Sequence, residues 1–173
     1  MKLAASAYNL YLVRHAVAET RDDTKYPDDA GRPLTSKGKR KMEEISQGLT
    51  RLGIEFDWII SSPLVRAKET AKILAQEVAY DGEMTVSETL APGGSMNALL
   101  QMLAKRPEAR SVALVGHEPD LSHLLAELVA ASDSASLGFR KGGVALVTFS
   151  KNPARGQGEL VWLLTPKILR QLA

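Results

Sequence analysis

Residues 10–16 have the sequence Leu-Tyr-Leu-Val-Arg-His-Ala, a short apolar run that ends in an arginine and a histidine. Residues 112–119, Val-Ala-Leu-Val-Gly-His-Glu-Pro, show a similar arrangement, so His15 and His117 each follow an apolar run. Runs of this length and composition are typical of parallel strands that are buried on both faces. In open α/β sheets, ligands bind just beyond the carboxyl ends of such strands. We therefore expect both histidines at the ligand-binding edge of a sheet.

Strand-like runs alternate with helical patterns along the rest of the chain. The predicted strands are Tyr8–Val13, Asp57–Ser61, Met84–Leu90, Val112–Val115, Gly143–Phe149 and Glu159–Leu164. Apolar residues at helical spacing predict helices through Met42–Leu52 with a stop at Gly53, Leu64–Val78, Leu99–Leu103 and Pro119–Val129. Ser62 is predicted to cap the second of these helices with Pro63 at its first position, and Ser95 to cap the third.

This alternation predicts an α/β fold, with a mainly parallel open sheet covered by helices on both faces in three layers. The last two strands are expected to form a hairpin, so one strand should run antiparallel. The length of 173 residues fits a single domain over residues 1–173. Two segments carry no pattern, Glu19–Arg32 and Ala130–Gly142. The first lies directly after His15, and loops held by a scaffold often carry function.

The bulk composition excludes several classes of site. The chain has 45% hydrophobic and 24% charged residues, as ordinary soluble globular proteins do, and it has no cysteine. Disulfides, thiolate zinc sites and cysteine nucleophiles are therefore excluded. Basic and acidic residues are nearly balanced, and a net charge of +2 is too small to predict nucleic-acid binding. The apolar start before Ser6 is too short for a signal peptide, and no run approaches the ~18 residues of a membrane span, so we expect a cytoplasmic protein.

Three strand ends are predicted to converge on one anion-binding pocket. Arg14 and His15 end the first strand, Arg66 lies in the first turn of the helix after the second strand, and His117 ends a later strand. A helix N-terminus favours anions, and two guanidinium groups beside it can bind a phosphoryl group through forked hydrogen bonds. The pattern favours phosphate chemistry. His123 is expected to be an ordinary helix residue, because three histidines without cysteine make a poor metal site.

Four segments resemble the histidine phosphatase superfamily, which includes the phosphoglycerate mutases. Residues 12–16 are similar to its Arg-His-Gly signature, residues 61–70 to its second motif and residues 115–119 to its third, while residues 32–38 match a further typical segment. The His-Glu-Pro stretch and the short segment between Glu88 and Ser111, where mutases carry an inserted lid, most resemble the SixA-type phosphohistidine phosphatases. Ala16 replaces the signature glycine, which is tolerable where the backbone φ is negative.

The resemblance implies a phosphoglycerate mutase-like fold and a role for each motif residue. His15 would be the nucleophile, Arg14 and Arg66 would bind the phosphoryl oxygens, and His117 would stabilise the developing charge. Glu88 is the expected general acid. Glu19 and Asp22, on the loop after His15, are the alternatives. The arginines would supply the positive charge, so neither a metal nor a cofactor is expected.

Three functions are compatible with this site. The first is a phosphatase that works through phosphorylated His15, with phosphohistidine in a protein as its substrate and that phosphoprotein as its partner. The second is a phosphatase or mutase that acts on small phosphomonoesters. The third is a phosphate-binding module without catalysis, which the presence of both arginines and both histidines argues against.

Overall fold

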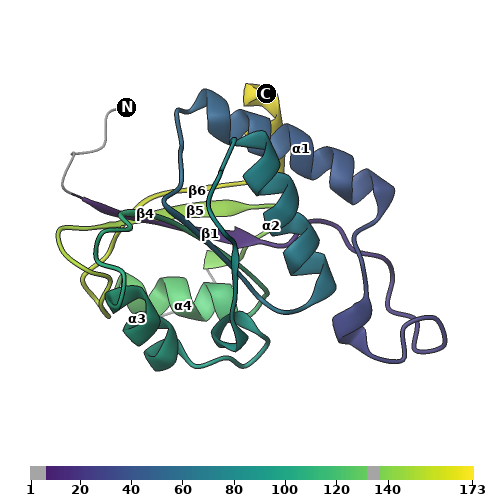
Figure 1. Ribbon diagram of the computed structural model, residues 1–173, viewed down its shortest axis with the longest axis horizontal. Coiled ribbons are helices and arrows are strands. Elements are labelled where there is room, and N and C mark those ends of the chain that lie inside the picture. The colour runs from purple at the N-terminus through teal and green to yellow at the C-terminus, as the bar shows by residue number, and fades with distance from the viewer. Residues whose placement is uncertain (1–6, 132–136) are drawn as a thin grey trace.

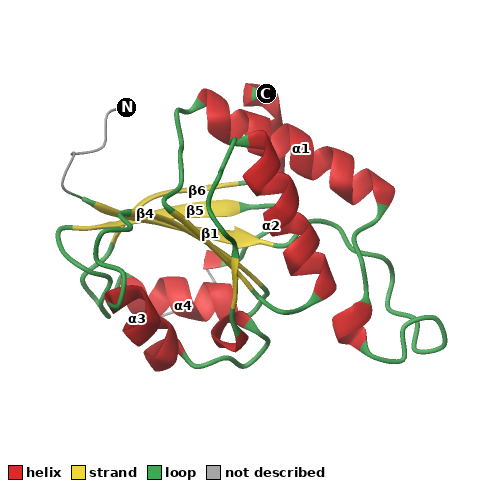
Figure 2. Cartoon of the chain, viewed as in Figure 1, coloured by secondary structure: helices red, strands yellow, loops and turns green. Residues whose placement is uncertain are grey.

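The computed structural model describes residues 7–131 and 137–173, which form a sheet with helices on both of its faces (Figures 1 and 2). The strands are β1 (Tyr8–Arg14), β2 (Trp58–Ser61), β3 (Thr85–Val86), β4 (Ser111–Gly116), β5 (Val144–Phe149) and β6 (Glu159–Leu164). The α-helices are α1 (Ser36–Arg51), α2 (Val65–Glu77), α3 (Met96–Ala104), α4 (Asp120–Leu128) and α5 (Pro166–Leu172). Two short 3₁₀ helices, η1 (Asp29–Gly31) and η2 (Glu88–Leu90), complete the described elements.

The strand order in the sheet is β3-β2-β4-β1-β5-β6. The pairs β3–β2, β2–β4 and β4–β1 are parallel, whereas β5 is antiparallel to both of its neighbours. The predicted mainly parallel sheet with a final hairpin and one reversed strand is therefore confirmed. Arg14 lies opposite Gly116 in the ladder, and Ser61 lies opposite Val115. Because β1, β2 and β4 are parallel, their carboxyl ends meet at one edge.

Two apolar cores lie on opposite faces of the sheet, as the three-layer prediction requires. Along β1, Leu10 and Leu12 belong to the core under α3 and α4, while Tyr11 and Val13 belong to the core under α1, α2 and α5. This alternation follows the period of two in a strand. Figure 1 shows α1 and α2 above the edge-on sheet and α3 and α4 below it. Burial on both faces explains why β1 and β4 are nearly continuous apolar runs.

Helix α1 packs closely against the segment that follows β1. The Thr35 hydroxyl accepts a hydrogen bond from the Gly38 amide at 2.8 Å and so caps the helix. A side chain at Gly38 would place its Cβ 2.1 Å from the Val17 carbonyl oxygen, so only glycine fits there. After the helix, Gly53 has a φ of +71°, which confirms it as the predicted stop.

The prediction for the start of α2 was wrong in detail. The helix begins at Val65 rather than at Pro63, and its N-cap residue Leu64 makes no side-chain capping bond. Ser62 is fully buried, and its hydroxyl forms a hydrogen bond with His117 as well as accepting one from the Leu64 amide. This serine therefore serves the strand-end site instead of capping the helix.

The predicted strand Met84–Leu90 was also too long. Only Thr85–Val86 pairs with β2, because β2 itself ends at Ser61. The Ser87 hydroxyl then accepts a hydrogen bond from the Thr89 amide and starts η2. Helix α5 was not predicted. It packs on α1 through Leu169, which is fully buried.

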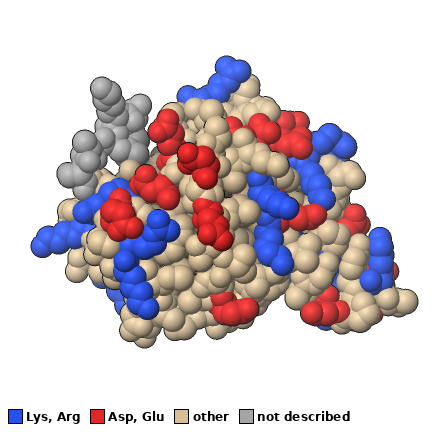
Figure 3. All heavy atoms as spheres, in the orientation of Figure 1, with Lys and Arg blue, Asp and Glu red and all other residues tan. Residues whose placement is uncertain are grey.

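The surface shows charges of both signs. On the face in Figure 3, Lys and Arg side chains are interspersed with Asp and Glu. Among residues 7–131 and 137–173, no helix has the length and apolarity needed to cross a membrane. Nearly all of the signal-like start, and the middle of the patternless segment 130–142, lie outside the described residues.

Candidate active site

The carboxyl ends of β1 and β4 bring His15 and His117 together. Their ring centroids lie 5.1 Å apart with 51° between the ring planes. The backbone of His15 is fixed on both sides, because its amide donates to the Gly116 carbonyl at 3.1 Å and its carbonyl accepts from the Gly142 amide at 3.2 Å. Only 6% of His15 and 3% of His117 is exposed. The predicted meeting of the two histidines at a sheet edge is confirmed.

The hydrogen bond of His15 defines which ring nitrogen carries a lone pair. Its Nδ1 lies 2.7 Å from the carbonyl oxygen of Ala16. Because a carbonyl oxygen can only accept, Nδ1 must carry the proton and donate it. The neutral ring then has its lone pair on Nε2. This is the tautomer that a nucleophilic histidine needs if it attacks through Nε2.

His117 is oriented by Ser62. Its Nε2 lies 2.7 Å from the Ser62 hydroxyl oxygen, and that oxygen also accepts from the Leu64 amide at 3.3 Å. The other ring nitrogen, Nδ1, is buried and has no protein partner within the described residues. When the serine hydroxyl donates to Nε2, the proton of the neutral ring resides on Nδ1. His117 can therefore present Nδ1–H as a donor to a bound group.

Arg66 is held by Asp29, a residue from the loop after β1. The guanidinium donates to the Asp29 main-chain carbonyl at 2.9 Å and forms an ion pair with its carboxylate at 3.0 Å. The second carboxylate oxygen accepts from Nε of Arg32 at 2.9 Å. Arg66 is almost completely buried, and its Nε has no protein partner within the described residues. Asp29 thus fixes two arginines while leaving donor groups of Arg66 unused.

Arg14 lies half-buried at the end of β1. One of its terminal nitrogens donates to the Phe139 carbonyl, whereas its Nε is buried without a protein partner. Burying a donor without an acceptor costs about 1–3 kcal/mol. Two such donors lie at this edge, on Arg14 and Arg66, and Nδ1 of His117 is a third when the Ser62 hydroxyl donates to Nε2. A ligand with several acceptor oxygens, such as a phosphoryl group, would satisfy them.

The site keeps both histidines neutral. Burial lowers the pKa of His15 to about 3; the hydrogen bond to Ala16 opposes this, and the nearby His117, Arg66 and Arg14 reinforce it. Burial likewise lowers the pKa of His117 to about 4, with Arg66 and Arg14 adding to the effect and Asp29 opposing it. At neutral pH the imidazole of His15 is therefore an unprotonated base. The positive charge of the site resides on its arginines.

These low pKa values predict a loss of stability in acid. Above about pH 6.5 the two histidines are neutral in both the folded and the unfolded chain. As the pH falls from there toward the folded values near 3 and 4, only the unfolded chain binds the protons, so folding weakens. At pH 5 the expected cost is about 2 kcal/mol per histidine.

Denaturant unfolding at pH 8 and pH 5 would measure this cost. Between the two pH values, the wild-type chain should lose about 4 kcal/mol more unfolding free energy than a His15→Gln, His117→Gln double variant. Equal losses in the two proteins would contradict neutral histidines in the folded state.

The three candidate acids lie in different surroundings. Glu88 starts η2 and is exposed. Asp22 is also exposed, and its carboxylate accepts from the amides of Thr24 and Lys25 within its own turn. Glu19 is half-buried, and its carbonyl accepts from Arg32 at 2.8 Å. None of the three forms an ion pair with the arginines of the site within the described residues.

Sequence reasoning missed three residues of this site. Ser62 and Arg32 lie within the segments that carried the family resemblance, so the motifs could have indicated them. Asp29 belongs to the patternless loop, and no local signal pointed to it. Ala16 behaves as expected for a tolerated replacement of glycine, because it is buried without a positive φ.

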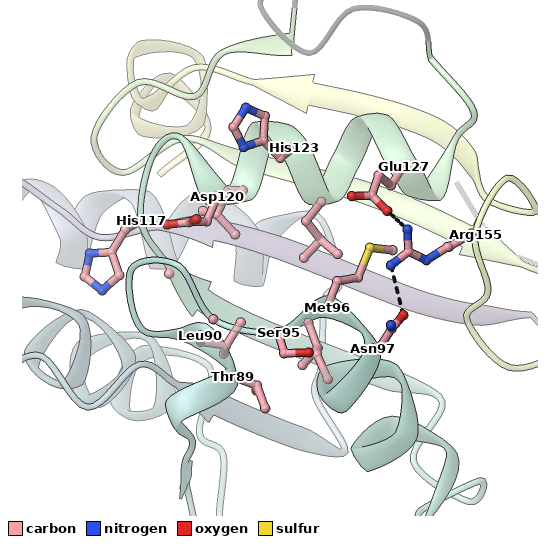
Figure 4. Close-up of a pocket in the computed structure, with 15 residues that line it drawn as sticks. Thr89, Leu90, Ser95, Met96, Asn97, His117, Asp120, His123, Glu127 and Arg155 are labelled. Carbon is pink, nitrogen blue, oxygen red and sulfur yellow. Dashed lines mark hydrogen bonds and ion pairs between the residues drawn. The ribbon is translucent and has the colours of Figure 1, made fainter.

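A cleft continues from His117 between α3 and α4 (Figure 4). Its volume is about 310 Å³. Thr89 and Leu90 of η2 line it, and Asp120, His123 and Glu127 follow one another along α4. Glu88 itself is not among the lining residues, although the next two residues are.

The chain belongs to the histidine phosphatase superfamily. The sequence profile of its branch 1 matches residues 10–91, which carry the β1 and α2 motifs. An uncharacterised protein of Picosynechococcus sp. strain PCC 7002 is 37% identical over 167 residues, covering 92% of this chain and 98% of that protein. The profile match confirms the family that the motifs predicted, and membership supports a phosphatase.

Solved structures confirm the phosphoglycerate mutase-like fold. The protein histidine phosphatase SixA in complex with tungstate superimposes with a TM-score of 0.81 at 23% identity, covering 93% of this chain and 99% of that one. A phosphoserine phosphatase from Entamoeba histolytica bound to phosphoserine gives a TM-score of 0.66 at 17% identity, covering 92% and 98%. At these identities the likeness concerns the fold.

Proposed function

We propose that the chain is a phosphatase that transfers a phosphoryl group to Nε2 of His15 and then hydrolyses it, with phosphohistidine in a protein as the substrate. The observation that carries the proposal is the hydrogen bond between the buried His15 ring and the Ala16 carbonyl. Its Nδ1–H donates to the Ala16 carbonyl, and burial keeps the ring neutral, so Nε2 carries a lone pair at neutral pH. A neutral imidazole is able to attack phosphorus.

In the first step, Nε2 of His15 forms a bond to phosphorus while the bond from phosphorus to the substrate nitrogen breaks. The leaving imidazole takes up a proton. Charge on the equatorial oxygens is stabilised by the guanidinium groups of Arg14 and Arg66 and by Nδ1–H of His117. In the second step, water attacks phosphorus, the bond to His15 breaks, and inorganic phosphate leaves.

We retain Glu88 as the proposed general acid. Its neighbours Thr89 and Leu90 line the cleft that includes His117, so the backbone of η2 borders that cleft. Asp22 is a poorer candidate because its carboxylate already serves two amides of its own turn. A substrate with a labile P–N bond has less need of a strong acid than a phosphoester has.

A phosphorylated protein side chain is favoured as substrate by the absence of an inserted lid. In the short segment between Glu88 and Ser111, η2 and α3 pack on the core through Leu90, Leu99 and Leu103. The SixA structure named above belongs to a protein histidine phosphatase, and its similarity in fold extends over almost all of this chain. A site without an inserted lid suits a side chain that protrudes from another protein.

A panel of substrates tests the proposal. Release of phosphate would be measured from a histidine-phosphorylated protein, from phosphoserine and from a sugar phosphate, with a His15→Ala variant as the blank. We expect kcat/KM for the phosphohistidine protein to exceed the others by at least about a hundredfold, which corresponds to about 2.7 kcal/mol in transition-state binding. A higher kcat/KM for phosphoserine or the sugar phosphate would contradict the protein substrate but not the phosphatase.

A further inference from the structure

The cleft that continues from His117 has features that phosphoryl transfer does not use. Its floor includes Leu99, Leu121 and Leu124, which belong to the core under α3 and α4, and its rim is polar. Its wall along α4 presents Asp120 and Glu127, seven residues apart. That separation spans about 10 Å along a helix, the length of about three extended residues. The cleft can therefore hold a short segment of chain next to the phosphoryl site.

The far end of this cleft is closed by an ion pair. Arg155, from the turn between β5 and β6, pairs with the Glu127 carboxylate and also donates to the Asn97 side chain at 2.9 Å. Figure 4 shows these two contacts as dashed lines between α4, α3 and the turn. Because Arg155 compensates Glu127, that carboxylate adds little net charge to the cleft.

Asp120 is a carboxylate without a cationic partner in the described part of the chain. It is half-buried at the start of α4, and its Oδ1 accepts from the Gly93 amide at 3.2 Å. In Figure 4 its carboxylate extends to the His117 side of the cleft. The cleft thus shares His117 with the cationic phosphoryl site, and its uncompensated charge on that side is negative. A second anionic group on a substrate would be repelled there.

We propose that this cleft binds the polypeptide segment flanking the phosphorylated side chain, and that Asp120 selects segments with a cationic residue beside it. The inference rests on the proposed phosphohistidine phosphatase activity and deepens it by naming the substrate class. Apolar side chains of the segment contact Leu121 and Leu124. A lysine or arginine of the segment pairs with the Asp120 carboxylate, while the phosphoryl group lies against the arginines.

Two synthetic phosphohistidine peptides would test this assignment. They would be identical except for lysine or glutamate on both sides of the phosphohistidine, and phosphoramidate would serve as a small substrate that does not reach the cleft. The wild-type chain should favour the lysine peptide by about tenfold in kcat/KM, because two partly exposed charge contacts differ between the peptides. If only the arginines of the site acted on the flanking charges, the chain would favour the glutamate peptide instead.

The decisive variant is Asp120→Asn, whose side-chain oxygen can still accept from the Gly93 amide. It should abolish the lysine preference, mainly through a higher KM for the lysine peptide, and change phosphoramidate hydrolysis by less than about twofold. Asp81→Asn is the matched control. It removes an exposed carboxylate beyond the C-terminal end of α2, away from Arg66, and should behave as the wild type.

The outcomes separate this inference from the proposed function. Hydrolysis of both peptides without a lysine preference, or with one that survives Asp120→Asn, would overturn the cleft assignment and leave the phosphohistidine phosphatase intact. If Asp120→Asn lowered kcat/KM equally for the peptides and for phosphoramidate, Asp120 would be part of the phosphoryl site, and the cleft assignment would also be overturned. If neither peptide were hydrolysed but phosphoserine were, both proposals would be overturned.

Discussion

Replacing His15 by alanine is expected to lower phosphate release by at least about ten-thousandfold and to abolish the covalent phosphoenzyme. In the proposed mechanism Nε2 of His15 forms the bond to phosphorus, whereas Nε2 of the neighbouring His117 is engaged by the Ser62 hydroxyl. Rapid quenching in alkaline denaturant with ³²P-labelled substrate should trap a label on the wild-type chain that is stable in alkali and lost in acid, and none on the variant. Residual turnover within about a hundredfold of the wild type would contradict the assignment of the nucleophile.

A His117→Asn variant provides the contrast that makes this result specific. His117 is proposed to donate a hydrogen bond to the phosphoryl group rather than to form a bond with it. Loss of one such donor costs about a hundred- to a thousandfold in rate, yet the label should still accumulate on His15. Circular dichroism and thermal unfolding would establish that both variants fold. A His15→Gln variant, which fills more of the buried space than alanine, should match His15→Ala in activity.

The sequence was sufficient to predict the central part of the fold. Strands buried on both faces leave apolar runs, and β1 and β4 were recognised from such runs with nearly correct ends. Helix α1 was equally clear, because Met42, Ile45 and Leu49 recur at helical spacing and face the core. In these elements local pattern and tertiary packing agree, which is the condition for reliable prediction.

The elements that were mispredicted depend on contacts between distant residues. Ser62 has the local sequence of a helix cap, but its hydroxyl is used by His117, 55 positions further along the chain. The apolar and β-prone residues 84–90 suggested a strand, but β2 ends after Ser61 and offers only two pairing positions. Helix α5 is short, and its burial rests mainly on Leu169. Tertiary context decided each case.

For the site, sequence could predict the strand-end residues but not what holds them. The parallel direction of β2, β4 and β1 brings His15, His117 and Arg66 to one edge, and that direction was predicted from the alternation of strands and helices, whereas the strand order was not. The contact between Asp29 and Arg66 joins two segments 37 positions apart across a loop. No periodicity or capping signal encodes such a contact, so only the folded chain reveals it.

The second large effect is expected for an Arg66→Gln variant, which should have a kcat/KM about a thousandfold lower than the wild type. The guanidinium is nearly completely buried, and an arginine that stabilises a transferring phosphoryl group is worth about 10³ or more in rate. Arg66→Lys keeps the charge but loses the planar fork, so it should recover no more than about tenfold of that loss. Measured kcat/KM and the affinity for inorganic phosphate should fall together in both variants.

Asp29→Asn separates the binding role of Arg66 from its positioning by the loop. Asparagine keeps the main-chain carbonyl that accepts from Arg66 and removes only the carboxylate shared with Arg32. If Asp29 merely positions the guanidinium, activity should fall by no more than about tenfold, the scale of one partly exposed charge contact. If the variant instead lost as much activity as Arg66→Gln, the Asp29 carboxylate would have to take part in phosphoryl transfer itself. If the Arg66→Gln variant retained both turnover and phosphate affinity, Arg14 and His117 would suffice to bind the phosphoryl group.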